Sequence, residues 1–262
     1  MTYRDNSPDV RPTSGRRWIL WLAAIAVILV FLAALVRVAF HAFVAINPSL
    51  TGDADQTKTL FVQLDPFYVQ ADGVTQFEVY GGSSNVIIQP YHDNERKGFV
   101  RITEGYLDDG SDRRHLFWTV ENGTLRIDDN EYGLAITSGK MVTIELPSDI
   151  IACLESVDLT CSSGTLTMDG LDCEALTLRV ASGSADVVVQ GEPERIACDV
   201  QSGQARIALP HDLGFTPNVQ EASGKVTIEQ RLNDVDGVAV YGDGYTKLDL
   251  TVASGRIDIS AL

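Results

Sequence analysis

A Ser-Gly dipeptide that recurs along the second half of the chain constrains the fold more than any other feature. Successive copies are 19, 20, 21 and 31 residues apart. Apolar residues alternate with other residues on both sides of each dipeptide, and this two-residue period is typical of two β-strands joined by a turn. One such unit cannot bury its apolar side chains alone, so the repeats predict the stacked coils of a parallel β-solenoid.

The glycine of each dipeptide is expected at a corner of its coil, where either a positive φ or a close approach to the next coil excludes a Cβ atom. The fourth repeat is irregular, because Pro217 and Glu221 occupy positions that are apolar in the other repeats. We interpret it as a distorted coil, followed by an inserted segment, residues 231–245, and then by the last coil. The five structural corner residues are Gly164, Gly183, Gly203, Gly224 and Gly255.

Opposite charges fall at outward positions of consecutive coils. Arg179 precedes its Ser-Gly by the same number of residues as Asp199 does, and Asp186 and Arg206 match in the same way after theirs. Such pairs face each other one strand spacing apart and each stabilises a sheet by only about 0.2–1 kcal/mol. We interpret them as exposed structural ladders, not as catalytic pairs.

The preceding residues, 59–147, alternate as well but lack the Ser-Gly unit. Asn122-Gly123 lies between two candidate strands and is a strong hairpin signal, which is preferred here over its interpretation as a glycosylation sequon. We expect hairpins and short coils that cap one end of the solenoid formed by residues 148–262, since an uncovered end would expose sheet edges. The candidate strands are 60–64, 75–80, 85–89, 99–103, 115–120 and 125–127.

Residues 18–36 contain no charged side chain and predict a membrane-spanning helix. Nineteen residues at 1.5 Å per residue span roughly 28 Å, close to the thickness of a bilayer core. A cleaved signal peptide is the alternative, but its apolar region is shorter and its one Ala-x-Ala sequence, at residues 24–26, lies inside the span. We expect an uncleaved transmembrane α-helix over 18–46, a cytoplasmic segment 1–17 before it and a linker 47–58 after it.

The charge distribution predicts the orientation of this helix. Residues 1–17 carry four Arg and two Asp, whereas residues 37–262 carry 16 basic and 34 acidic side chains, a net charge of −18. Because basic flanks stay in the cytoplasm, the C-terminal part is expected to be extracytoplasmic, with the lipid bilayer as a partner of the helix. The acidic balance also excludes a nucleic-acid partner.

The later strands and repeats resemble a known family. The stretches that carry the resemblance are ENGTLRI (121–127), ELP (145–147), the Ser-Gly repeats and, most specifically, YGDGYTKLDLTVASGRIDI (241–259). They are similar to the bacterial "putative adhesin" β-strand-repeat family, a domain of unknown function, over roughly residues 60–262. The resemblance implies an extracytoplasmic β-helical domain with a surface or envelope role, and it supplies no catalytic residues.

No motif of catalysis or of cofactor binding is present. The four histidines, at 41, 92, 115 and 211, show no metal-ligand spacing, and there is no C-x-x-C, G-x-S-x-G or phosphate-binding glycine loop. We therefore predict a non-enzymatic adhesin or envelope-binding or sensing module with an unknown envelope or surface ligand and without cofactors. The alternative is a carbohydrate-active β-helix enzyme, which would need Asp, Glu, Arg or Lys converging on one solenoid face.

Acidic clusters leave calcium open as a weaker option. None of them has EF-hand spacing, and acidic loops are common on exported domains. The weak calcium candidates are Asp108, Asp109 and Asp112, with further clusters at residues 128–131 and 234–236.

The four cysteines are not equivalent in the repeat. Cys161 and Cys198 lie at inward positions two coils apart, hence at least about 9 Å apart, too far for a disulfide, so we expect buried free thiols. Cys153 and Cys173 lie on neighbouring coils at nearly the same repeat position. They are the disulfide candidate, and four free thiols are the alternative.

Overall fold

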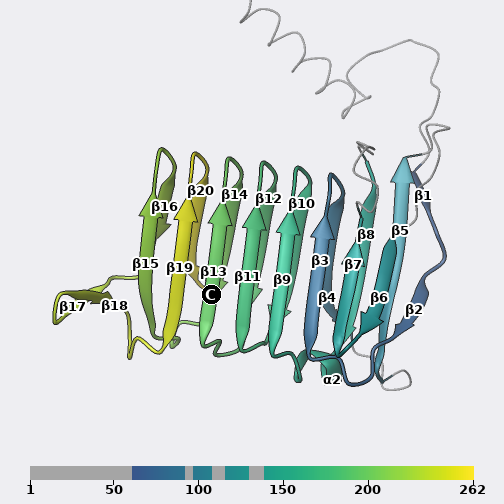
Figure 1. Ribbon diagram of the computed structural model, residues 1–262, viewed down its shortest axis with the longest axis horizontal. Coiled ribbons are helices and arrows are strands. Elements are labelled where there is room, and N and C mark those ends of the chain that lie inside the picture. The colour runs from purple at the N-terminus through teal and green to yellow at the C-terminus, as the bar shows by residue number, and fades with distance from the viewer. Residues whose placement is uncertain (1–60, 92–96, 108–115, 130–138) are drawn as a thin grey trace, which may run out of the picture. The chain divides into compact units, whose positions relative to one another are not determined.

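The strands of this chain form two facing sheets in which most neighbours run parallel (Figure 1). The structure is a computed structural model and describes residues 61–91, 97–107, 116–129 and 139–262. The all-β, solenoid-like fold expected from the sequence is confirmed. The elements are β1 (Phe61–Gln63), β2 (Phe67–Gln70), β3 (Gln76–Gly81), β4 (Asn85–Tyr91), β5 (Phe99–Leu107), β6 (Phe117–Glu121), β7 (Thr124–Asp128), β8 (Met141–Pro147), α2 (Ser148–Ile151), β9 (Ser156–Cys161), β10 (Thr165–Leu171), β11 (Ala175–Val180), β12 (Ser184–Val189), β13 (Arg195–Val200), β14 (Gln204–Leu209), β15 (Phe215–Glu221), β16 (Lys225–Ile228), β17 (Asn233–Val235), β18 (Val238–Val240), β19 (Thr246–Val252) and β20 (Arg256–Ala261).

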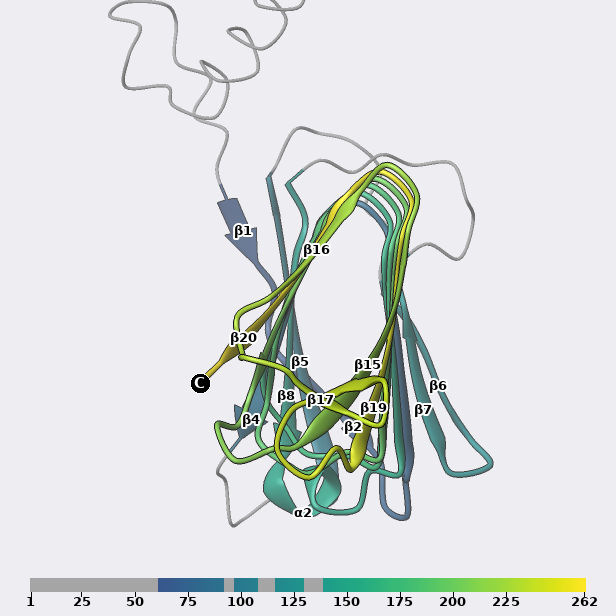
Figure 2. The same ribbon diagram turned by 90° about the vertical axis from the view of Figure 1, so that its left-hand side faces the viewer.

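Each of the five Ser-Gly repeats contributes one strand to each sheet and turns at its Ser-Gly dipeptide. The turns are superposed along one margin of the stack, and the sheets diverge from it (Figure 2). Alternate side chains point between the sheets, so that Leu159 on β9 faces Leu178 on β11, which faces Cys198 on β13. All three are at most 2% exposed. The stacked coils therefore share one continuous apolar core, which no coil could form alone.

The corner glycines avoid a clash with the neighbouring coil, and none of the five has a positive φ. A Cβ atom on Gly203 would overlap the carbonyl oxygen of Gly183 and lie 2.6 Å from Cγ1 of Val180. Gly183 would meet Gly164, and Gly255 would meet Gly203, in the same way. Of the two reasons that the sequence allowed, close approach is therefore the correct one and positive φ is wrong.

The serine of each dipeptide bonds to the adjacent coil. The Ser202 N–H and hydroxyl both donate to the carbonyl oxygen of Ala181, at 2.7 and 3.3 Å. Ser182 donates in the same two ways to the carbonyl of Ser162. The Ser-Gly turns thus form a ladder of their own, and the glycines permit its close spacing.

The spatial order of the coils differs from their order in the chain. The last coil, β19–β20, lies between β13–β14 and β15–β16, so the fourth repeat is the end of the stack. The fourth repeat does form a coil, as interpreted, but the expected stacking of the last coil beyond it is wrong. The inserted segment, with its hairpin β17–β18, carries the chain past the end coil and back into the stack (Figure 1).

The irregular residues of the fourth repeat protect this end. Phe215 exchanges two backbone hydrogen bonds of 2.8 Å with Tyr241, and Pro217 presents no N–H on the same outer edge of β15. On β16, the N–H of Val226 faces away from β20 and donates to the Glu221 carboxylate at 2.5 Å. Proline and an inward-placed charge are devices that stop strand pairing at a sheet edge.

The same transposition occurs at the other end. The coil β3–β4 lies between β9–β10 and β7–β8, although β7–β8 comes between them in the chain. Its turn, Gly81-Gly82-Ser83-Ser84, matches the Ser-Gly turns in space, and the sequence analysis missed this relation. Antiparallel strands then close the stack: β5 pairs with β8, β1 and β2 pair with β5, and β6 pairs with β7. The predicted cap contains the Asn122-Gly123 hairpin as expected, with φ of 52° and 76° at the two turn residues.

Several predictions fall outside the described residues. They are the transmembrane helix over 18–46, its flanks 1–17 and 47–58, and the calcium candidates Asp108, Asp109 and Asp112. Among the residues that the structure does describe, no helix has the length and apolar character needed to cross a bilayer.

Candidate functional site

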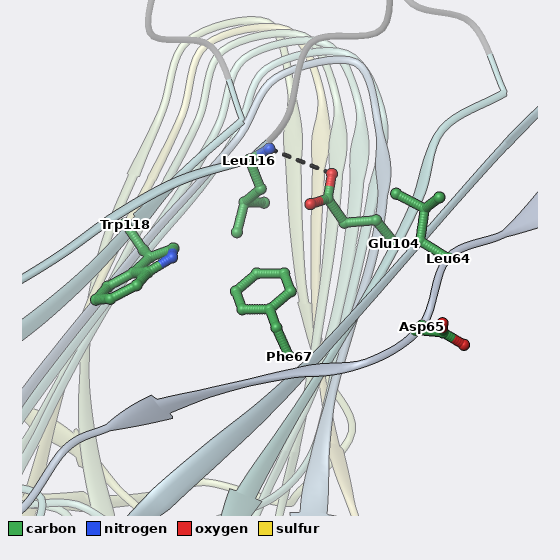
Figure 3. Close-up of a pocket in the computed structure, with 6 residues that line it drawn as sticks. All are labelled: Leu64, Asp65, Phe67, Glu104, Leu116 and Trp118. Atoms are coloured by element: carbon green, nitrogen blue, oxygen red, sulfur yellow. Dashed lines mark hydrogen bonds between the residues drawn. The ribbon is translucent and has the colours of Figure 1, made fainter.

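An open pocket lies between the two sheets at the end of the stack formed by β1, β2 and β6 (Figure 3). Its volume is about 330 Å³, and most of its lining is apolar. Small-ligand sites generally start at roughly 300 Å³, so the pocket can enclose a group of the size of one aromatic ring or a short hydrocarbon chain. The lining residues are Leu64, Asp65, Phe67, Glu104, Leu116 and Trp118.

Strand pairing positions the aromatic walls. Phe67 begins β2 and lies opposite Ile102 of β5, while Trp118 on β6 lies opposite Ile127 of β7. Ile102 and Ile127 are both buried, so each aromatic side chain lies against the apolar interior. Trp118 is nevertheless 41% exposed, because β6 is the last strand of its sheet within the described residues. The site is therefore an apolar interior left open at the last strand of each sheet.

Glu104 joins the two sides of the pocket. Its backbone carbonyl accepts the N–H of Leu64 at 2.8 Å, and its carboxylate Oε2 accepts the N–H of Leu116 at 3.2 Å. The strand β5 continues the inward alternation of Val100 and Ile102, which places Glu104 among buried residues. The sequence analysis ended this strand at residue 103, and an extension by one residue would have revealed a charged side chain at an inward position.

A buried charge cluster adjoins the pocket. The ammonium of Lys140 lies 3.2 Å from Oε2 of Glu104 and also contacts Oδ1 of Asp129, whose Oδ2 accepts the hydroxyl of Ser84. The side chains of Lys140, Glu104 and Asp129 are 7%, 6% and 4% exposed. Two carboxylates and one ammonium leave a net charge of −1, and residues of four separate segments meet there. The sequence pattern indicated only Asp129, as part of the acidic cluster at residues 128–131, and none of its contacts with Lys140 and Ser84.

The outer faces carry the charge ladders expected from the sequence. Arg206 pairs with Asp186 at 3.8 Å as predicted. Arg179 lies opposite Asp199 in the register, but its guanidinium bonds to Asp158 at 2.5 Å instead. These pairs are spread along the outer faces. A polysaccharide-cleaving site would need such side chains to converge on one face.

One outward carboxylate is clearly stabilised in its charged form. Hydrogen bonds from Asn218 at 3.1 Å and from Arg195 at 2.9 Å hold the pKa of Asp249 below its ordinary value. All three side chains lie on the outer face of the sheet that contains β13, β19 and β15. Their role is to bridge three coils near the end of the stack.

Residues of the inserted segment make local hydrogen bonds. Asp234 accepts the N–H of Gly237 at 2.8 Å within the hairpin turn, and the hydroxyl of Tyr241 donates to the backbone carbonyl of His211 at 2.9 Å. Within residues 61–91, 97–107, 116–129 and 139–262, no three His, Cys, Asp or Glu side chains are grouped as metal ligands.

All four cysteines are free thiols, so the predicted Cys153–Cys173 bond is not formed. Ala175 pairs with Ser156, and this register places Cys173 beside Leu154, not beside Cys153. Cys173 and Leu154 are buried, while Cys153 is exposed on the other side of the chain. The one-residue difference in repeat position thus separates the two thiols. Cys161 and Cys198 are buried, as predicted.

Burial strongly affects two of these thiols. Desolvation, with a contribution from the neighbouring carboxylate of Asp172, raises the pKa of Cys173 to about 12. Desolvation likewise raises the pKa of Cys198 to about 12, with Asp199 adding to the effect. A thiol with such a pKa stays protonated at neutral pH and is a poor nucleophile.

Comparison with known proteins agrees with the fold. Residues 152–260 match the model of the family described as Toastrack DUF4097. The predicted resemblance to the "putative adhesin" repeat family is confirmed, over a shorter range than residues 60–262. None of the curated proteins matches the sequence.

Solved structures align with this chain at low sequence identity. A putative cell adhesion protein from Clostridium sporogenes aligns with a TM-score of 0.58 and 12% identity, over 78% of this chain and all of that one. A putative adhesin from Bacteroides fragilis aligns with a TM-score of 0.33 and 11% identity, over 79% of this chain and all of that one. At 12% identity the similarity to the Clostridium protein concerns the fold alone.

Proposed function

We propose that this chain is a single-pass membrane protein whose extracytoplasmic β-solenoid is a non-enzymatic, adhesin-like module that binds or senses a component of the cell envelope. The observation that carries the proposal is the open apolar pocket at the end of the stack. Its walls are held by strand pairing and by the hydrogen bonds of Glu104, so the pocket is preformed. A preformed apolar site binds a ligand without the cost of ordering its own walls.

The ligand proposed for this pocket is an apolar group attached to a larger polar envelope molecule. Phe67, Leu116 and Trp118 would enclose the apolar group, and the open side would leave the remainder in water. The surrounding strands present polar and charged side chains on their outer faces, so the pocket is a distinct apolar feature there. The name of the similar Clostridium protein supports an adhesive role by analogy of fold only.

The membrane anchor of the proposal rests on residues 18–36 and on the charge difference across them. Its test is protease treatment of intact cells that express the full chain with a tag at each end. External protease should remove the C-terminal tag and spare the N-terminal one. The reverse pattern would refute the proposed orientation.

The pocket is tested with 4-nitrophenyl β-D-glucoside, a neutral probe with one aromatic ring and a water-soluble tail. The full chain in lipid nanodiscs carries three Trp, so Trp18→Phe and Trp21→Phe leave Trp118 as the only reporter. We expect saturable quenching of Trp118 emission. Phe67→Glu should abolish it, whereas the matched control Phe61→Glu, an exposed aromatic outside the pocket lining, should not.

The same probe separates binding from catalysis. A glycoside-cleaving site would release coloured 4-nitrophenolate, and the proposed binding module should quench without any release. Quenching that Phe67→Glu leaves intact would refute the pocket as the binding site. Release of nitrophenolate by the purified chain, lost on mutation of a described carboxylate, would favour the enzyme alternative.

A further inference from the structure

The buried cluster beside the pocket places an amine, two carboxylates and a hydroxyl in contact inside the protein. The ammonium nitrogen of Lys140 contacts Oδ1 of Asp129 and lies 3.2 Å from Oε2 of Glu104. Ser84, 1% exposed, donates its hydroxyl to the other oxygen of Asp129. Ion pairs that are this buried contribute little net stability, because desolvation offsets the attraction. The burial of these four side chains in contact with one another is therefore better explained by a chemical role than by stabilisation of the fold.

We propose that Lys140 and Asp129 form an intramolecular isopeptide bond, with Glu104 as the proton carrier. The bond would link Nζ of Lys140 to Cγ of Asp129. It requires no cofactor, oxidant or partner molecule, and it forms once within each folded chain.

The proposed step balances in atoms and charge. Glu104 takes one proton from the Lys140 ammonium, and the lone pair of the resulting amine attacks Cγ of Asp129. A second proton of the nitrogen and the proton held by Glu104 move to Oδ1. The Cγ–Oδ1 bond then breaks and Oδ1 leaves as water. The ammonium and the carboxylate are converted into a neutral amide, and Glu104 regains its charge.

The surroundings favour each part of this step. The folded chain holds Nζ of Lys140 in contact with the carboxylate of Asp129. The two groups therefore react at a high effective concentration and need no encounter by diffusion. Ser84 donates to Oδ2, the oxygen that carries negative charge during the attack and remains as the amide oxygen. Exclusion of water makes the conversion of two buried charges into a neutral product favourable and limits hydrolysis.

Backbone hydrogen bonds hold the reacting groups in place before the step. The carbonyl of Lys140 accepts the N–H of Asn85 at 2.9 Å, and the N–H of Asp129 donates to the carbonyl of Tyr80 at 3.0 Å. Glu104 is fixed by the N–H of Leu116. Glu104 is therefore fixed on β5, Asp129 directly after β7 of the facing sheet and Lys140 directly before β8, and a bond between residues 129 and 140 would join the end of β7 to the start of β8.

Intact-mass measurement of the purified full chain tests the proposal directly. The expected result is a mass about 18 Da below the sequence mass, the loss of one water molecule. Digestion should yield a branched peptide that contains both Lys140 and Asp129. Wild-type chain of full mass, with both residues in linear peptides, would overturn the proposal without recourse to any variant.

Variants assign the roles. Lys140→Arg keeps the positive charge but should show the mass calculated from its own sequence, without the loss of water. The matched control Lys225→Arg, which changes an exposed lysine on β16, should still lack the mass of one water molecule. Glu104→Gln retains both Lys140 and Asp129 but removes the proton carrier. The rate at which the refolded chain loses water should therefore fall by at least tenfold. A deficit that persists in Lys140→Arg would show dehydration elsewhere, for instance at Asp236-Gly237, and would overturn the assignment.

Discussion

A valine at Gly203 is expected to destabilise the protein far more than removal of the serine hydroxyl beside it. Gly203 lies in the turn of the third Ser-Gly repeat, in the middle of the stack. Its missing Cβ would overlap the carbonyl oxygen of Gly183, which is part of the backbone of the next coil and cannot rotate away. The valine must therefore push two coils apart or distort the turn.

The magnitude follows from the crowding. Overpacking a tight site costs about 1–3 kcal/mol, and about 2–4 °C in Tm accompanies each kcal/mol for a domain of this size. Gly203→Val should therefore lower Tm by about 2–12 °C. Ser202→Ala removes only the 3.3 Å hydroxyl bond, since the N–H of Ser202 still donates to the same carbonyl at 2.7 Å. An exposed loss of this kind stays within about 0.5 kcal/mol.

Thermal unfolding of the full chain, followed by circular dichroism, measures both effects. Ser202→Val is the matched control, because it adds the same side chain one position away on the exposed side of the turn. Gly203→Asn distinguishes the two physical causes: asparagine tolerates positive φ but carries a Cβ. Near-wild-type stability of Gly203→Asn, or equal effects of Gly203→Val and Ser202→Ala, would refute the close-approach argument.

Further predictions concern thiols, edges and charge. Cys153, which is exposed, should react with maleimide in the folded chain at pH 7.5, whereas Cys198 should react only after unfolding; prompt labelling of Cys198 would contradict its burial. Because burial raises the pKa of Cys198 from its ordinary value of 9.0 to about 12, the folded state holds the thiol proton to higher pH than the unfolded state does, so stability should fall as pH rises from about 9 to 12, with a smaller slope in Cys198→Ala. The double change Pro217→Val and Glu221→Val should promote self-association of the chain through its unprotected end coil, visible as a concentration-dependent mass in light scattering; a monomer at all concentrations would show that these residues do not block pairing. Glu174 is stacked between exposed glutamates of the coils on either side, so Glu174→Gln should raise Tm slightly at low salt and not at 1 M salt; a salt-independent change would exclude charge repulsion as the cause.

The sequence predicted the coil but not the order of the coils. Alternation around each Ser-Gly is a local property, so strand positions and inward faces followed from it directly. The stacking order is set by contacts between the inward residues of neighbouring coils. These residues are apolar in every coil and nearly interchangeable, so the alternation does not show which coils are neighbours. Cys198 lies beside Leu250, yet Val219 of the fourth repeat would also have been an acceptable neighbour. Periodicity carries no information that separates these two pairings.

The signal that could have fixed the order was present at two positions. Pro217 and Glu221 were recognised as irregular, but irregularity in a repeat array is also the mark of a terminal repeat. Their meaning becomes clear only when the free edges of β15 and β16 are known. The pocket and the charge cluster were out of reach for a related reason: Glu104 meets Lys140 because β5 pairs with β8 far along the chain, and Trp118 reaches the pocket from the facing sheet.

The transposed coils determine how the domain would respond to mechanical force. The N-terminal and C-terminal coils in the chain, β3–β4 and β19–β20, are each held by a coil on both sides. In an ordinary repeat array, tension applied to the chain ends peels the outermost unit first, one bond after another. Here tension on the C-terminus acts on the coil β19–β20. Its strands pair with β13 and β15 in one sheet and with β14 and β16 in the other, so four hydrogen-bond ladders must shear together. At the C-terminus, therefore, the coil that bears the tension is not the exposed end coil of the stack, whereas tension from the N-terminal side acts first on the edge strand β1.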